Sequence, residues 1–209
     1  MKVLGIILLV FTLAGVWYLL PRGPVQDDVY EKLKAAAQRD DYESFAANLK
    51  IAYEKGWVLE TTETEETTGQ NRNKFVQLES EAYIKETKFF DQGDLERALR
   101  VSTTVYKQVP NAWRFRYLRI RALEKYGRNA FEAGDLVKAE DYAKQILAML
   151  YRPEGANLLG DIYIKKLEAD IAAKNKTQAI LDYNFISQYQ LTEDRTKRIN
   201  ELRIEGEKL

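Results

Sequence analysis

The chain has 209 residues, of which 45% are hydrophobic and 31% are charged, a composition typical of a folded domain. It contains 32 lysines and arginines and 32 aspartates and glutamates, so no excess of positive charge indicates nucleic-acid binding. Cysteine and histidine are absent, which excludes disulfides, thiolate nucleophiles, imidazole-dependent triads and the usual zinc sites. We therefore expect neither a metal nor a cofactor.

An uncharged segment opens the chain, at residues 3–20. As a helix it would be about 27 Å long, close to the roughly 30 Å hydrocarbon core of a bilayer. Trp17 and Tyr18 near its end are typical of the membrane interface, and Pro21 would end the helix. Residues 1–22 are therefore predicted to be an uncleaved signal anchor, with membrane contact through residues 3–20.

The alternative is a cleaved signal peptide, which would release a soluble exported protein. Bulky residues before Pro21 stand where a cleavage site needs small ones. The charges on the two sides of the segment favour opposite topologies. Lys2 favours a cytoplasmic N-terminus, whereas Arg22 and Lys32 after the segment oppose translocation of the chain that follows. We expect a single-pass membrane protein whose soluble domain lies outside the cytoplasm, on the periplasmic side in a bacterium.

Residues 23–56 are predicted to hold a linker and a degenerate first helical pair. Apolar residues recur there at the helical spacings of three and four, in two segments that separate at Asp40 and Asp41.

Residues 57–72 follow as an acidic, threonine-rich loop that we expect to be solvated. Threonine also favours strands, so the alternative is a hairpin in which residues 57–59 pair with residues 75–76. The loop would also suit a basic partner or a phosphorylation site.

A repeated turn marks residues 73–191. The segment GDLERA at 93–98 returns as GDLVKA at 134–139, 41 residues later. Glycine supplies the positive φ that ends one helix, and the following aspartate caps the next one. Ala98, Ala139 and Ala179 recur just after these turns, where small residues allow helices to approach closely.

These residues resemble the tetratricopeptide repeat family, whose unit is a pair of antiparallel helices with Gly-Asp at the turn and a small residue after it. Phe90 before the turn and Pro110 at the end of the second helix fit the same unit, and Lys174-Asn175 substitute for Gly-Asp in a later one. The spacing is 40 to 41 residues where the family has 34, which longer helices would accommodate.

The resemblance implies an all-α fold, a tetratricopeptide-like solenoid of helical hairpins over residues 73–191 behind an N-terminal transmembrane helix. Residues 192–209 would be a C-terminal capping helix with Thr192 at its start, because the last apolar face of such an array must be covered.

Basic residues are concentrated between residues 111 and 128, and several of them share one broad face of a helix. In the family, the first helices of successive pairs line a concave groove, where basic residues bind acidic ends of partner peptides. The resemblance implies such a groove here, with aromatic residues beside guanidinium groups. The candidate partner-binding residues are Tyr83, Thr87, Phe90, Arg114, Arg121, Lys125, Arg128 and Phe131.

The alternative for these arginines is internal pairing with carboxylates of the neighbouring unit, at Glu79, Glu81, Glu86 or Glu96. We expect no enzymatic activity, because the adjacent carboxylates of the chain would point apart.

By its architecture the chain is expected to be a non-catalytic scaffold that mediates protein–protein interactions in a multiprotein envelope or membrane assembly. Its partners would be other subunits of membrane complexes or acidic peptide segments. The alternatives are a chaperone-like receptor that binds client peptides transiently in the concave groove, and the soluble exported protein described above.

Overall fold

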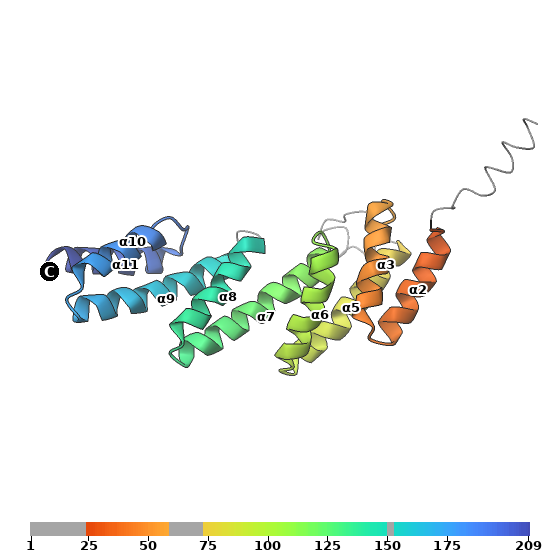
Figure 1. Cartoon of the computed structure of the whole chain (residues 1–209), viewed down its shortest axis with the longest axis horizontal. Coiled ribbons are helices and arrows are strands. Elements are labelled where there is room, and N and C mark those ends of the chain that lie inside the picture. Colours follow the sequence, from red (N-terminus) through yellow and green to blue (C-terminus); the bar gives the residue numbers. More distant parts are fainter. Residues whose placement is uncertain (1–23, 59–72, 150–152) are drawn as a thin grey trace, which may run out of the picture. The chain divides into compact units, whose positions relative to one another are not determined.

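A computed structural model describes residues 24–58, 73–149 and 153–209, and these ranges hold helices without a strand (Figure 1). The all-α prediction is thereby confirmed for this part of the chain. Contacts divide the chain into two compact units after Val76, inside α5. The helices are α2 (Gln26–Gln38), α3 (Tyr42–Glu54), α5 (Lys74–Asp91), α6 (Leu95–Gln108), α7 (Trp113–Glu132), α8 (Leu136–Met149), α9 (Pro153–Ala172), α10 (Lys176–Ile186) and α11 (Glu193–Glu207).

In the first unit, α2 and α3 pack as a pair. Leu33 of α2 and Phe45 and Leu49 of α3 are fully buried, as the helical spacing of their apolar residues predicts. The two helices separate at Asp40, whose φ of 57° ends α2, as predicted.

After α3 the chain is held against the start of α5. The ring of Trp57 stacks on that of Phe75 with the centroids 5.9 Å apart, and Asn73 Oδ1 accepts a hydrogen bond from the backbone N–H of Phe75 at 2.9 Å. Because Phe75 and Val76 lie in a helix, the alternative of a hairpin with residues 57–59 is wrong. The rest of the predicted acidic loop, residues 59–72, lies outside the described residues.

One turn recurs between the helices of a pair: a residue with positive φ is followed by a side chain that caps the next helix. In each of these turns, the side-chain oxygen of the capping residue accepts a hydrogen bond from the backbone N–H of the residue three positions after it. The turns are Asp40-Asp41 (φ 57°, cap bond 3.1 Å), Gly93-Asp94 (φ 92°, 3.0 Å), Gly134-Asp135 (φ 83°, 3.0 Å) and Lys174-Asn175 (φ 54°, 3.3 Å). The predicted equivalence of Lys174-Asn175 with Gly-Asp is confirmed.

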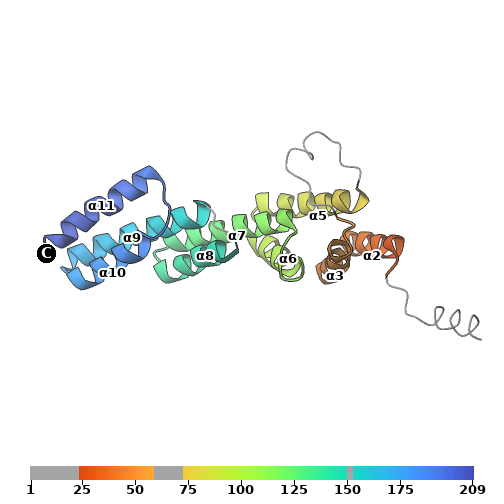
Figure 2. The same ribbon diagram turned by 90° about the horizontal axis from the view of Figure 1, so that it is seen from above.

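In the second unit, residues 77–209, α5 pairs with α6, α7 with α8, and α9 with α10, while α11 packs against α9 and α10 (Figure 2). Ala98, Ala139 and Ala179 are 0 to 4% exposed, so these alanines lie at helix contacts as predicted. The first helices of the pairs have 18 to 20 residues, which accounts for the long spacing between turns.

Helix α9 is central to the largest apolar cluster of this unit. Leu158, Leu159 and Ile162 of α9 are fully buried and pack with Ile186 of α10 and Leu202 of α11. Burial of a leucine or isoleucine side chain stabilises a fold by about 1.5 to 3 kcal/mol. The side of α9 that remains outside this cluster is therefore held rigidly in place.

The prediction of a single-pass membrane protein with an extracytoplasmic domain is corrected. Across residues 24–58, 73–149 and 153–209, none of the helices combines the length and the apolar character needed to cross a membrane. Residues 3–20, on which that prediction was based, lie outside the described residues.

Candidate functional site

The eight predicted partner-binding residues all lie in the second unit, but they do not form one surface. Tyr83, Thr87 and Phe90 belong to α5, and the other five belong to α7. The structure divides them into an interior group and a surface group.

Tyr83, Thr87 and Arg114 form the interior group. The Tyr83 ring meets the edge of Phe115 at 6.4 Å and packs on the small core between α5, α6 and α7. The Thr87 hydroxyl oxygen is buried and has no hydrogen-bond partner in the described part of the chain. Both residues are only partly exposed, so they offer little surface to another molecule, and their role in partner binding stays a prediction.

Arg114 is only 2% exposed, and its guanidinium lies 3.9 Å from the carboxylate of Glu79. Glu79 is itself fully buried. A buried pair of this kind holds α7 against α5, and breaking it would leave an uncompensated charge. The prediction that Arg114 binds a partner is therefore replaced by the alternative of internal pairing.

Arg121 lies at the surface between α5 and α7. Its guanidinium stands 4.4 Å from the centre of the Phe90 ring and donates to Asp91 at 3.2 Å. An aromatic ring and a guanidinium therefore lie side by side, as predicted. The guanidinium of Arg121, however, is already paired with a carboxylate of the chain, that of Asp91.

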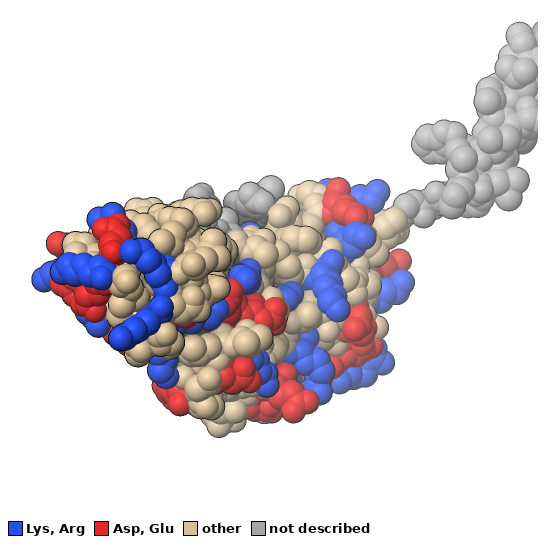
Figure 3. All heavy atoms as spheres, turned by 60° about the vertical axis from the view of Figure 1, so that its left-hand side comes forward, with Lys and Arg blue, Asp and Glu red and all other residues tan. Residues whose placement is uncertain are grey.

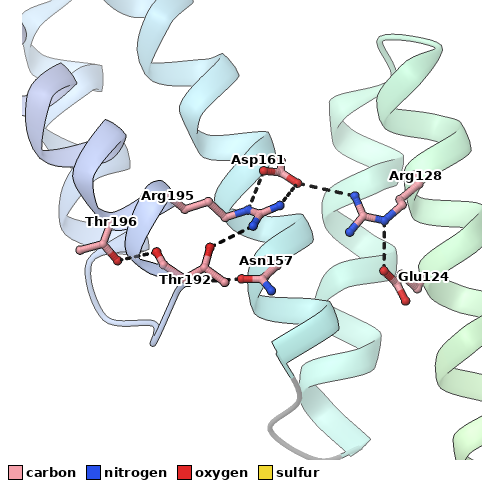
Figure 4. Close-up of polar contacts among 7 residues, drawn as sticks. All are labelled: Glu124, Arg128, Asn157, Asp161, Thr192, Arg195 and Thr196. Atoms are coloured by element: carbon pink, nitrogen blue, oxygen red, sulfur yellow. Dashed lines mark hydrogen bonds and ion pairs between the residues drawn. The ribbon is translucent and has the colours of Figure 1, made fainter.

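Arg128 takes part in a network that runs from α7 across α9 to α11 (Figure 4). It donates to Glu124 at 3.0 Å and lies 3.6 Å from Asp161 of α9. Asp161 also accepts two hydrogen bonds from Arg195 of α11, at 2.7 and 2.8 Å. The bonds to Asp161 raise the pKa of the Arg195 guanidinium, which therefore stays charged throughout the physiological range.

Thr192 begins α11 as predicted, but its hydroxyl does not cap the helix. The hydroxyl oxygen instead accepts a hydrogen bond from Arg195 at 2.9 Å, and the Thr192 N–H donates to Asn157 at 3.4 Å (Figure 4). The start of α11 is thus fastened to α9 by side chains.

These contacts define a surface that we call the odd-helix face. It is the side of α5, α7, α9 and α11 that carries Asp91, Arg121, Arg128, Asp161 and Arg195. Basic and acidic side chains also lie intermingled on the C-terminal helices (Figure 3), where Arg198 donates to Glu168 at 2.8 Å. Most cations of the face are therefore matched by a carboxylate of the same chain.

A hollow of about 320 Å³ opens on this face between α7 and α9. It is lined by Phe131, Asp161, Ile164, Lys165 and Glu168. The ammonium of Lys165 lies 4.7 Å from the centre of the Phe131 ring, a cation–π distance. Phe131, which the sequence singled out, is thus the aromatic wall of a partly apolar depression.

Lys165 and Lys125 differ from the arginines of the face. Both lysines are exposed, and in the described part of the chain neither has a carboxylate within ion-pair distance. Each lies on the helix surface that also carries Arg121 or Asp161, because residues four apart share a face. On the described part of this face, these two ammonium groups are open to another molecule.

Sequence reasoning missed the contribution of α9, although the signal was present. The repeat spacing of 40 residues relates Arg121, Lys125 and Arg128 of α7 to Asp161, Lys165 and Glu168 of α9. The same 40-residue shift would have shown that α9 carries carboxylates at the positions where α7 carries arginines.

Among the residues that the structure describes, no three carboxylates gather in a way that would hold a metal ion. No protein-family model, curated protein sequence or solved structure matches the chain. The resemblance to tetratricopeptide repeats therefore remains a prediction from its own residues.

Proposed function

We propose that the chain is a non-catalytic, tetratricopeptide-like scaffold and that the odd-helix face of its second unit binds a segment of another protein. The observation that carries this proposal is the hollow beside Phe131, with the unpaired Lys165 in its wall. Repeated turns and buried alanines support the helical-repeat part of the proposal.

The shape and chemistry of the hollow favour an apolar anchor. Phe131 and Ile164 supply apolar wall, and a depression of this size accepts a side chain such as leucine or phenylalanine. Burial of such a side chain contributes about 1.5 to 3 kcal/mol. It would supply most of the binding free energy of a short segment.

The charges favour a carboxylate beside that anchor. Lys165 and Lys125 are exposed and unpaired, whereas Arg121 and Arg128 are held by Asp91, Glu124 and Asp161. An exposed lysine–carboxylate pair contributes only about 0.2 to 1 kcal/mol. The lysines would therefore set the orientation and partner choice more than the affinity. The site proposed here therefore uses lysines, not the arginines predicted from the sequence, because the guanidinium groups of Arg121 and Arg128 already pair with carboxylates of the chain.

The absence of histidine and cysteine supports a non-catalytic role. On the odd-helix face, the carboxylates Asp91, Asp161 and Glu168 are engaged by arginines.

Site-specific photo-crosslinking tests the proposal. A photoreactive residue replaces Ile164 in the hollow or, as control, Val137, which is 80% exposed on α8 outside it. In the native cell extract, position 164 should form an adduct with a defined protein that position 137 does not form. Lys165→Glu should abolish that adduct, whereas Lys138→Glu on α8 should leave it unchanged. Identical adducts from both positions, or an adduct indifferent to Lys165→Glu, would reject the proposal.

A further inference from the structure

Arg119 stands at a position that is apolar and buried in the neighbouring long helices. Leu78 of α5, Arg119 of α7 and Leu159 of α9 are equally far from the residue with positive φ that follows each helix. Leu78 is 7% exposed and Leu159 is fully buried. A cation therefore takes the place of a core leucine in the middle member of the series.

The surroundings of Arg119 compensate its charge only in part. The guanidinium carbon lies 5.1 Å from the centre of the Tyr106 ring of α6. The Nε atom is buried and has no hydrogen-bond partner among the described residues, while Ile120 and Leu123 beside it belong to the core. Burial lowers the pKa of Arg119, Tyr106 opposes that effect only in part, and no carboxylate of the described residues contributes.

Three other arginines of α7 are matched by carboxylates. Arg114 faces Glu79, and Arg121 and Arg128 are paired across to α5 and α9. Arg119 lies about 180° around the helix from Arg128, because successive residues are about 100° apart. Arg119 therefore lies outside the odd-helix face. A ligand that binds it would occupy a different site from the hollow beside Phe131.

We propose that Arg119 and Tyr106 form an oxyanion site, at which the guanidinium binds a carboxylate or phosphate group. The guanidinium carbon lies at a cation–π distance of 5.1 Å from the ring centre, and such a contact leaves N–H groups free for a bidentate contact with an oxyanion. Arg119 is partly exposed, and of its three guanidinium nitrogens only Nε is both buried and without a partner, so the two terminal nitrogens supply that edge. A bound oxyanion provides the counter-charge that residues 24–58, 73–149 and 153–209 do not supply.

Thermal unfolding of the full chain tests this site. Unfolding temperatures are measured in chloride, acetate and phosphate at equal ionic strength, for the wild type, Arg119→Leu and the control Arg116→Leu, another arginine of α7. Phosphate stabilises most proteins by exclusion, so the readout is the difference between variants. The wild type and Arg116→Leu should gain more from the oxyanions than Arg119→Leu, which should lose this extra shift.

In chloride, Arg119→Leu should unfold at or above the temperature of the wild type, because leucine fits the equivalent positions 78 and 159. A response to phosphate alone assigns the site to phosphoryl groups, and a response to acetate as well assigns it to carboxylates too. Equal responses of the wild type and Arg119→Leu overturn the proposal.

If Arg119→Leu does not fold, Arg119→Lys takes its place, since lysine keeps the charge but lacks the planar fork. Arg119→Lys should then lose the extra shift, and its retention overturns the proposal. Independently, phosphate should move the Nε–H resonance of Arg119 in a nitrogen–proton NMR spectrum. An unmoved resonance also overturns it.

Discussion

Glycine serves two purposes in the second unit. In the turn after α7, Gly134 adopts a φ of 83° with open space around it, so only the backbone needs it. Within α7, Gly127 has no positive φ, but a Cβ there would lie 2.5 Å from Leu158 and 3.2 Å from Tyr142. The first glycine allows a turn, and the second allows three helices to meet.

Gly127→Ala should destabilise the chain although alanine is the better helix former. The added methyl group must displace Leu158 and Tyr142, at a cost of about 1 to 3 kcal/mol. The matched control is Gly206→Ala in α11, where the nearest atoms would be 3.7 Å away. That change should stabilise by about 0.5 kcal/mol. Urea unfolding measures both, and a stabilising Gly127→Ala would contradict the close packing.

Substitutions at the positive-φ residue of a turn should change the free energy of unfolding in different directions at Gly134 and at Lys174. Gly134→Ala forces a side chain into positive φ and should cost about 1 kcal/mol. Lys174 already has a φ of 54°, so Lys174→Gly removes that strain and should be neutral or stabilising. The free energies of unfolding from urea titrations compare the two. A loss of stability on Lys174→Gly as large as that of Gly134→Ala would show that the turns are not equivalent.

Helix α11 is attached to the rest of the unit by charge as much as by apolar contact. Only Ile199, Leu202 and Gly206 of its residues are buried. Arg195 contributes the bidentate bridge to Asp161, and Arg198 contributes another to Glu168. This makes Asp161 the residue on which the position of α11 depends most.

Asp161→Asn should loosen α11 selectively. It weakens the bonds to Arg195 and Arg128 at side chains that are about a quarter to two fifths exposed, so a loss of about 1 to 2 kcal/mol is expected. Hydrogen exchange should speed up in α11 while α8 stays protected. Glu168→Gln, whose bridge is more exposed, serves as control and should have the smaller effect. Uniform acceleration along the chain would count against this assignment.

A second polar cluster joins α8 to α9 and gives the fold a pH dependence. Burial would raise the pKa of Glu140, but hydrogen bonds from Lys144, Lys166 and Tyr163 more than offset it, and the pKa lies below the ordinary 4.5. A carboxyl with a lowered folded pKa adds stability above its unfolded pKa and loses it as the pH falls through the folded value.

Glu140→Gln should therefore destabilise the chain near pH 7 and have progressively less effect as the pH falls below about 4.5. Urea unfolding of both proteins between pH 3 and pH 7 measures the difference. Glu132→Gln, at an exposed position of α7, is the control and should show no such trend. A difference that stays constant down to pH 3 would mean that Glu140 does not keep its charge through these bonds.

Local features of these helices were predictable, and contacts between helices were less so. The caps at Asp94 and Asp135 and the turn at Lys174 follow from residues within one turn of the chain. Arg114 shares a helical face with Arg121 on a simple wheel, yet it is buried against Glu79, because neighbouring helices decide which part of that face is covered. The role of Asp161 depends on three helices and required the structure.

At the scale of the second unit, each helix contacts helices that are near it in sequence, so the ends of this succession differ from its middle. The middle helices α7, α8 and α9 are covered on two sides. Helix α11 covers the apolar side of α9 and α10, at Leu159, Leu167 and Ala179. The exposed residues Lys197 and Glu201 keep its outer surface polar.

Deletion of residues 192–209 should therefore expose a continuous apolar surface. The shortened chain should bind more of the dye ANS and self-associate more strongly than the full chain, since apolar patches of several hundred Å² promote association. Light scattering and dye fluorescence measure this. The control is Ile204→Ser with Leu209→Ser, which removes exposed apolar groups in and just after α11 but keeps the helix, and should match the full chain. A shortened chain that stays monomeric without dye binding would show that α11 is an appendage, not a cap, because the surface beneath it would then need no cover.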